Sequence, residues 1–209
     1  MKIVLDFDHT LFDTEMFKQA LQDRLSLFGV TTNQFNSNYR IIKEQLGYYN
    51  YKEHLKLLAK DVKIDENDLL LNFNEVVSSA NEFLYPDALN FLKKLKSIPD
   101  AELYLLTFGQ DEFQQAKVEA SGIKPYFAEV ADTIESKLVF FDQNENLQSA
   151  IFLDNRGKTI DEIKTKYPKI ITIWIKRTNT PYDDEGCERT DFQVDSLSEA
   201  LKYISDTKK

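Results

Sequence analysis

Residues 2–15 read KIVLDFDHTLFDTE. The stretch begins with a short apolar-leaning run, which leads directly into two aspartates, Asp6 and Asp8. A run of this length, bounded by polar residues, is typical of a buried strand. In open α/β sheets, ligands bind beyond the carboxyl ends of the strands, so both carboxylates are predicted where chemistry is expected. Side chains two positions apart on an extended chain share a face, and the two acids are therefore candidates for one shared task.

Three further apolar segments have the same character, and helical patterns separate them. They are residues 101–108 (AELYLLTF), 149–154 (SAIFLD) and 169–175 (KIITIWI). Weaker strands are predicted around Val130 and, at an edge, around Val194. Near-continuous apolar strands that alternate with helices predict a parallel sheet covered on both faces. The predicted fold class is therefore α/β, a doubly wound, Rossmann-like core.

One interval interrupts this alternation, because it has helical periodicity and no convincing strand. Apolar side chains recur at three- and four-residue steps between Met16 and Phe28 and again between Leu69 and Leu84. We predict an all-helical domain over residues 14–84, inserted into a core formed by residues 1–13 and 85–209. His54, in the helical stretch KEHLKLLAK, is predicted to be a surface residue.

Composition limits the classes of partner. The 209 residues carry a formal net charge of −9 with a pI near 4.9, which argues against a nucleic-acid polymer or an anionic membrane as partner. A single cysteine, Cys187, cannot form an intrachain disulfide and fits a reducing compartment. With no signal-peptide core and no run of membrane-spanning length, we expect a cytoplasmic protein, either a monomer or a homodimer.

The stretch DFDHTLFDTE resembles the first motif of the haloacid dehalogenase-like (HAD) hydrolase superfamily. The resemblance implies that Asp6 is the nucleophile that forms an aspartyl phosphate, and that Asp8 is the general acid and base. The alternative, without a catalytic role, is a turn whose aspartates cap the next helix. Because a D-x-D-x-T string alone is not decisive, the choice depends on the motifs that the superfamily places downstream.

The second and third motifs have counterparts that imply phosphate-binding residues. The strand-like LYLLTF ends with Thr107, whose hydroxyl would bind a phosphoryl oxygen, and TIESK supplies Lys137 to neutralise the nucleophile and the phosphate. The alternatives are an ordinary strand-end threonine and a solvated surface lysine. Lys124 and Lys117 are poorer candidates for the cation, since Lys117 lies inside an amphipathic helix.

The fourth motif, AIFLDNRGKTIDEI, implies a magnesium site. Mg²⁺ prefers hard oxygen ligands, and the resemblance assigns it Asp6, the carbonyl oxygen of Asp8, and Asp154. The sequence departs from the commonest pattern here, because Asn155 and Lys158 stand where that pattern has a second acid. Asparagine can still bind a metal through its carbonyl oxygen or hold a coordinated water, so the role of Asn155 stays open.

Taken together, the four motifs predict a Mg²⁺-dependent phosphatase that acts on a small phosphorylated substrate, such as a sugar phosphate or nucleotide. The resemblance also implies that the inserted helices form a cap that closes over the site and excludes water. Asp8 disfavours dehalogenation, whose halide leaving group needs no acid. A phosphomutase stays open, as does a catalytically weak relative that binds a phosphorylated ligand or a protein. Strand alternation predicts that His9 points away from both acids.

Overall fold

A computed structural model describes residues 1–207 of the chain. Its centre is a six-stranded sheet with the order β3-β2-β1-β4-β5-β6, in which every neighbouring pair is parallel. The predicted doubly wound α/β class is confirmed, including both weak strands, one of them at the predicted edge. The strands are β1 (Lys2–Leu5), β2 (Glu102–Phe108), β3 (Glu129–Thr133), β4 (Ile151–Asp154), β5 (Ile171–Ile175) and β6 (Phe192–Val194).

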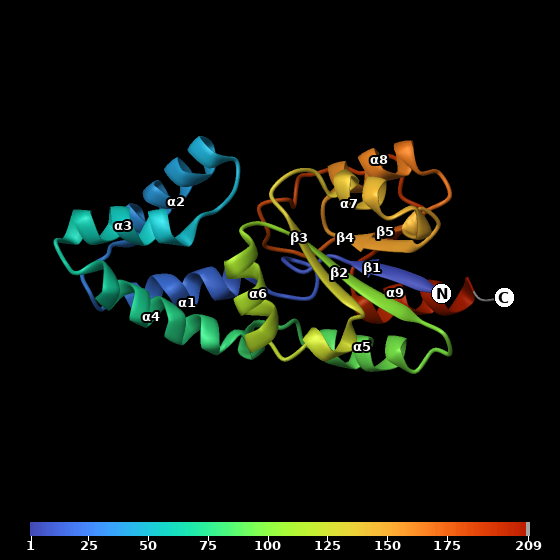
Figure 1. Cartoon of the computed structure of the whole chain (residues 1–209), viewed down its shortest axis with the longest axis horizontal. Coiled ribbons are helices and arrows are strands. Elements are labelled where there is room, and N and C mark those ends of the chain that lie inside the picture. Colours follow the sequence, from blue (N-terminus) through green and yellow to red (C-terminus); the bar gives the residue numbers. More distant parts are fainter. Residues whose placement is uncertain (208–209) are drawn as a thin grey trace.

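Helices cover both faces of this sheet. In Figure 1, α7 and α8 lie on one face, and α5 and α9 lie on the other. Alternating strand residues divide the core accordingly: Ile3 and Leu5 pack in the cluster that includes α5 and α9, and Val4 packs with α7 and α8. These helices are α5 (Ala88–Lys96), α6 (Asp111–Ala120), α7 (Lys137–Gln143), α8 (Gly157–Lys166) and α9 (Leu197–Asp206), with short 3₁₀ turns η2 (Lys124–Tyr126) and η3 (Glu145–Leu147).

The interval between β1 and α5 is helical, as its periodicity predicts. Figure 1 shows these helices extending together beyond one end of the sheet. Local signals set their bounds: Asp65 accepts the amide hydrogen of Asn67 at the start of α4, and Gly47 ends α2 in the left-handed conformation. The elements are α1 (Thr14–Ser26), α2 (Thr32–Leu46), α3 (Tyr51–Val62), α4 (Glu66–Ser78) and the 3₁₀ turn η1 (Ala80–Phe83).

The chain enters and leaves this helical interval through two adjacent segments. The amide of Asp13 donates to the carbonyl of Phe83 at 2.7 Å, and the amide of Tyr85 donates to the carbonyl of Leu11 at 3.0 Å. The helices are thereby attached immediately after the turn that carries Asp8. The division into core and cap domains stays a prediction, and we use "cap segment" for residues 14–84. Within residues 1–207, no helix has both the length and the apolar character needed to cross a membrane.

The prediction that His54 is a surface residue is wrong. Its side chain is fully buried, with its Nε2 3.0 Å from the carbonyl oxygen of Phe35 and its Nδ1 2.9 Å from the hydroxyl of Tyr49. The cause is helical spacing, because His54 shares a face of α3 with the buried residues Tyr51 and Leu58, three and four positions away. A titratable side chain therefore occupies a core position in the cap segment and meets hydrogen-bonding groups there.

Candidate active site

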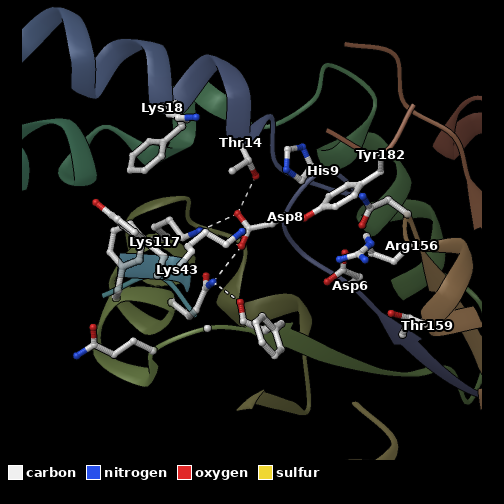
Figure 2. Close-up of a pocket in the computed structure, with 18 of the residues that line it drawn as sticks. Asp6, Asp8, His9, Thr14, Lys18, Lys43, Lys117, Arg156, Thr159 and Tyr182 are labelled. Carbon is white, nitrogen blue, oxygen red and sulfur yellow. Dashed lines mark hydrogen bonds and ion pairs between the residues drawn. The ribbon is translucent and has the colours of Figure 1, made fainter. Parts of the chain in front are cut away.

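The two aspartates of the first motif lie at the carboxyl edge of the sheet, in a tight turn. The amide of Asp6 donates to the carbonyl of Leu153 at 2.9 Å, so Asp6 continues the pairing of β1 with β4. The chain then turns around the carbonyl of Phe7, which accepts the amides of Leu11 and Phe12. This turn carries Asp8 away from the sheet and toward the cap segment, as Figure 2 shows.

Asp6 is part of a buried ion cluster. The ammonium of Lys137 lies 2.5 Å from one oxygen of Asp6 and 2.7 Å from an oxygen of Asp154, and all three side chains are buried. The hydroxyl of Thr10 donates to the other oxygen of Asp6 at 3.0 Å, and the amide of Arg156 donates to Asp154 at 2.7 Å. The fold therefore brings together the predicted nucleophile, the third-motif lysine and the fourth-motif acid, from β1, α7 and β4.

Burial and charge act against each other in this cluster. Burial raises the pKa of Asp6 to about 7; Lys137 opposes that shift and Asp154 adds to it. Burial alone would lower the pKa of Lys137, but Asp154 and Asp6 raise it above its ordinary value. With Lys137 protonated and both acids ionised, two carboxylates face one ammonium. The ionised cluster therefore has an excess of one buried negative charge, which an added cation would offset.

Asp8 has a separate set of partners. The ammonium of Lys117 donates to both of its oxygens, and Gln114 Nε2 and the hydroxyl of Thr14 donate at 3.0 and 2.8 Å. Burial alone would raise the pKa of Asp8, but Lys117 and Thr14 hold it below the ordinary value. Sequence reasoning ranked Lys117 as a poor candidate, yet its side chain is buried. The available signal was its position four residues after Phe113, on the inward face of α6.

Thr107 and Asn155 each contribute a buried polar atom with no hydrogen-bond partner in the part of the chain that the structure describes. The hydroxyl oxygen of Thr107 and the amide nitrogen of Asn155 are inaccessible to solvent and make no hydrogen bond within the described residues. Asn155 lines the main cavity, whereas Thr107 precedes the lining residues Phe108, Gly109 and Gln110. Buried polar groups are nearly always hydrogen-bonded, so unpartnered ones beside an acid cluster are candidates for ligand contact.

A cavity of about 330 Å³ opens over the two aspartates, between the cap segment and the sheet edge. His9 lines it, although strand alternation predicted that this ring points away from the acids. His9 adopts a left-handed backbone conformation with φ 58°, so strand geometry does not apply to it, and its ring lies edge-on to Tyr182 at 5.4 Å. The guanidinium of Arg156 stacks 4.1 Å from the same tyrosine ring. Figure 2 shows His9, Arg156 and Tyr182 on one side of Asp8.

The donor set fits a magnesium ion in its chemistry. Asp6 and Asp154 supply hard carboxylate oxygens, and the excess negative charge of their cluster with Lys137 suits a divalent cation. Within residues 1–207, no three His, Cys, Asp or Glu side chains are grouped so as to hold a metal ion. The predicted set contains only two carboxylates and one main-chain carbonyl, so it would rely on water for the remaining positions, as Mg²⁺ sites commonly do.

Comparison with known proteins agrees with the first-motif resemblance. The family model described as haloacid dehalogenase-like hydrolase matches residues 3–151. No curated protein sequence matches the chain. The family match covers more than half of the 209 residues, so it extends well beyond a single short motif.

Similar folds occur among solved structures. A protein from Burkholderia xenovorans LB400, assigned as a haloacid dehalogenase-like hydrolase, has a TM-score of 0.78 at 19% identity, covering 96% of this chain and 97% of its own. The HAD-hydrolase YfnB from Bacillus subtilis, bound to magnesium, has a TM-score of 0.66 at 13% identity over 97% of each chain. The L-2-haloacid dehalogenase from Xanthobacter autotrophicus reaches 0.64 at 18% identity over 98% of each chain. At these identities the likeness concerns the fold alone.

Proposed function

The chain belongs to the haloacid dehalogenase-like hydrolase family, and from this premise we propose that it is a Mg²⁺-dependent phosphatase acting on small phosphate monoesters. The observation that carries the proposal is the contact of the Asp6 carboxylate with Lys137 and, through it, with Asp154, beside a second acid at the same sheet edge. A nucleophilic carboxylate, a neutralising cation and a neighbouring acid are what transfer of a phosphoryl group to the protein requires.

The proposed reaction has two steps, both on Asp6. In the first, an Asp6 oxygen bonds to phosphorus, the bond from phosphorus to the ester oxygen breaks, and the released alcohol oxygen takes up a proton. In the second, water bonds to phosphorus and gives up a proton, and the bond from phosphorus to Asp6 breaks. Inorganic phosphate leaves and the Asp6 carboxylate is regenerated.

The surrounding residues would bind and orient the transferred group. Lys137 would offset the negative charge that gathers around Asp6 as phosphorus is attacked. Thr107 and Asn155 each hold a buried, unpartnered polar atom that a phosphoryl oxygen could satisfy. A magnesium ion held by Asp6, Asp154 and the carbonyl of Asp8 would supply orientation and electrostatic stabilisation of the phosphate.

Asp8 favours phosphate transfer over dehalogenation, although dehalogenases are among the similar folds. A halide leaves without a proton, so dehalogenation has no use for a second acid, whereas an alkoxide leaving group needs one. In the arrangement described, Lys117 keeps Asp8 ionised, which suits proton removal from water in the second step. For the first step Asp8 would have to carry a proton, which its contact with Lys117 opposes.

The decisive experiment measures phosphate release from a panel of phosphate monoesters, with Mg²⁺ and with excess chelator. The wild type is compared with Asp6→Asn, which keeps shape but removes the nucleophile, and with Asp23→Asn on the exposed side of α1 as a matched control. We expect metal-dependent release that Asp6→Asn abolishes and Asp23→Asn preserves. Release that survives Asp6→Asn would refute the mechanism.

Two further readouts separate the alternatives. Halide release from 2-haloacids, dependent on Asp6 and unaffected by chelator, would replace phosphatase by dehalogenase. Isomerisation of a sugar phosphate without phosphate release would identify a phosphomutase. The substitution of asparagine for a second acid at position 155 is the feature that favours a weakly catalytic binder. Such a protein would bind phosphorylated compounds and turn none of them over.

A further inference from the structure

Two lysines of the cap segment converge on one aromatic ring in the wall of the cavity. The ammonium of Lys18, from α1, lies 4.6 Å from the centre of the Tyr39 ring, and that of Lys43, from α2, lies 5.6 Å from it. All three residues line the cavity that opens over Asp6 and Asp8. In the view of Figure 2, Lys18 lies on the opposite side of Asp8 from Asp6 and Arg156.

Among the described residues, these two lysines have no carboxylate partner, unlike three other cations that line the cavity. Lys117, Lys137 and Arg156 each form an ion pair with an acid. Within residues 1–207, no ion pair is formed by Lys18 or by Lys43. The neighbouring acid Glu15 lies instead 3.8 Å from the ring of His9, with its side chain partly exposed.

Like charges surround Lys43. Burial lowers the pKa of Lys43, and the positive charges of Arg156 and Lys18 lower it further, against weaker attraction from Asp8 and Glu15. Positive charge without a matching carboxylate at a cavity wall creates a local potential that attracts an anion. A phosphoryl group bound at Asp6 would meet Lys137, which already pairs with Asp6 and Asp154, whereas within residues 1–207 neither Lys18 nor Lys43 pairs with these acids.

The cavity wall also has an apolar part formed by aromatic and aliphatic side chains of the cap segment and of α6. It consists of Phe17, Leu21, Phe35, Tyr49 and Phe113. A cavity of about 330 Å³ is in the range of sites that hold small organic molecules. A substrate that fills this cavity would therefore place an apolar or aromatic body against these side chains.

We propose that Lys18 and Lys43 bind a second anionic group of the substrate, so that the preferred substrates are phosphate monoesters whose apolar or aromatic body also carries a carboxylate or a second phosphate. This inference rests on the proposed phosphatase function, since it assigns the far end of the same substrate. Lys18 and Lys43 act as specificity determinants: they contact the group that is not transferred and leave the chemistry to Asp6.

The test measures binding of a matched set of phosphonates, which mimic a phosphate ester but cannot be hydrolysed. The set is benzylphosphonate, 4-carboxybenzylphosphonate and the corresponding compound with a second phosphonate, each titrated by calorimetry. We expect the wild type to bind the better of the two compounds with a second anionic group at least about tenfold more tightly than benzylphosphonate, the factor given by one charge-assisted hydrogen bond. Whichever of these two compounds binds more tightly identifies the second group as carboxylate or phosphate.

The matched variants are Lys18→Gln combined with Lys43→Gln, and, as a control, Lys60→Gln on the exposed surface of α3. We expect the preference for the compound with a second anionic group to fall to about twofold or less in the double variant and to persist in the control. Equal binding of all three compounds by the wild type, or a preference that survives the double substitution, overturns the inference. Unfolding temperatures of all variants establish that each is folded.

A kinetic comparison separates this inference from the proposed function. The ratio of kcat/KM for 4-carboxyphenyl phosphate to that for phenyl phosphate is measured in the wild type and in the double variant. Asp6-dependent hydrolysis without any preference for the carboxylated ester refutes the anion site and leaves the phosphatase intact. Lysine-dependent phosphonate binding without any hydrolysis leaves the anion site intact and refutes the phosphatase.

Discussion

The ammonium of Lys117 donates to both oxygens of Asp8, at 2.7 and 3.0 Å, from a helix that lies more than one hundred residues later in the chain. The lysine side chain is only 3% exposed and that of Asp8 is 21% exposed. Aromatic rings surround the ammonium at 5.0 to 5.9 Å, namely those of Phe7, Phe12, Phe17 and Phe113. The charge state of the second acid of the motif is therefore set by a residue outside that motif.

Replacing this lysine tests how strongly it controls the acid. In Lys117→Met, which preserves most of the side-chain volume, we expect the pKa of Asp8 to rise from its lowered value, because burial then acts without the opposing charge. We also expect a loss of about 3 kcal/mol in the free energy of unfolding, as for a buried pair that loses one partner. Carboxyl-carbon NMR and urea denaturation at neutral pH measure the two effects.

The control is Lys124→Met, because Lys124 forms an exposed ion pair with Glu119 that should contribute little. An Asp8 pKa that stays lowered in Lys117→Met would mean that Gln114 and Thr14 suffice to hold the carboxylate ionised. The role assigned to the lysine would then be wrong.

The sheet could be predicted because its strands are buried on both faces. Segments such as residues 149–154 are apolar almost without interruption, and this pattern is typical of strands in a parallel sheet that is covered on both faces. The convergence of Asp6 and Asp154 was predicted from the family resemblance, and the sheet explains it, because β1 and β4 are parallel neighbours whose carboxyl ends meet at one edge. The assignment of Lys137 needed the family resemblance as well, since nothing in its local sequence separates it from a surface lysine.

Helical periodicity alone was not enough to predict that Lys117 and His54 are buried, and the reason is the same for both. Helical periodicity identifies which positions face inward, but a polar residue at such a position is normally read as an interruption of the apolar face. Whether it is buried depends on a partner from a distant segment, here Asp8 for Lys117 and Tyr49 for His54. Periodicity within one helix carries no information about that partner.

Magnesium binding should be detectable without any substrate. The cluster of Asp6, Asp154 and Lys137 carries an excess negative charge when both acids are ionised, so we expect Mg²⁺ to raise the unfolding temperature at constant ionic strength. At a concentration one hundred times the dissociation constant, the gain is about 2.7 kcal/mol. Asp154→Asn should remove most of the shift. An equal shift in Asp154→Asn, measured by scanning calorimetry, would exclude Asp154 as a ligand.

Packing between α8 and the loop that carries Tyr182 should depend on Gly157. A Cβ at this position would lie 2.1 Å from the carbonyl oxygen of Gly186, which is backbone and cannot rotate away. We expect Gly157→Ala to lower the free energy of unfolding by about 1–3 kcal/mol, the usual cost of overpacking. Gly186→Ala is a matched control, because a Cβ there meets nothing within 4 Å. Similar urea midpoints for both variants would contradict this account of the contact.

Burial of His54 should make stability depend on pH in a defined window. Burial lowers the pKa of His54 from 6.5 to about 4, and the hydrogen bond with the Phe35 carbonyl opposes this shift only in part. Between these two values the unfolded chain binds more protons at this site than the folded protein does. Stability is therefore complete above pH 6.5 and is lost as the pH falls toward 4, by up to about 3 kcal/mol for this group.

The effect is isolated by comparing the wild type with His54→Gln in urea denaturation at pH 7 and pH 5. We expect the wild type to lose more stability between these two conditions than the variant, because glutamine takes up no proton. The chain has one other histidine, His9, whose pKa burial also lowers. His9→Gln is therefore measured in the same way, to give the separate contribution of that ring to the pH dependence. If His54→Gln and the wild type lose the same stability between pH 7 and pH 5, the ring of His54 accepts its proton in the folded protein and its burial does not govern the acid sensitivity.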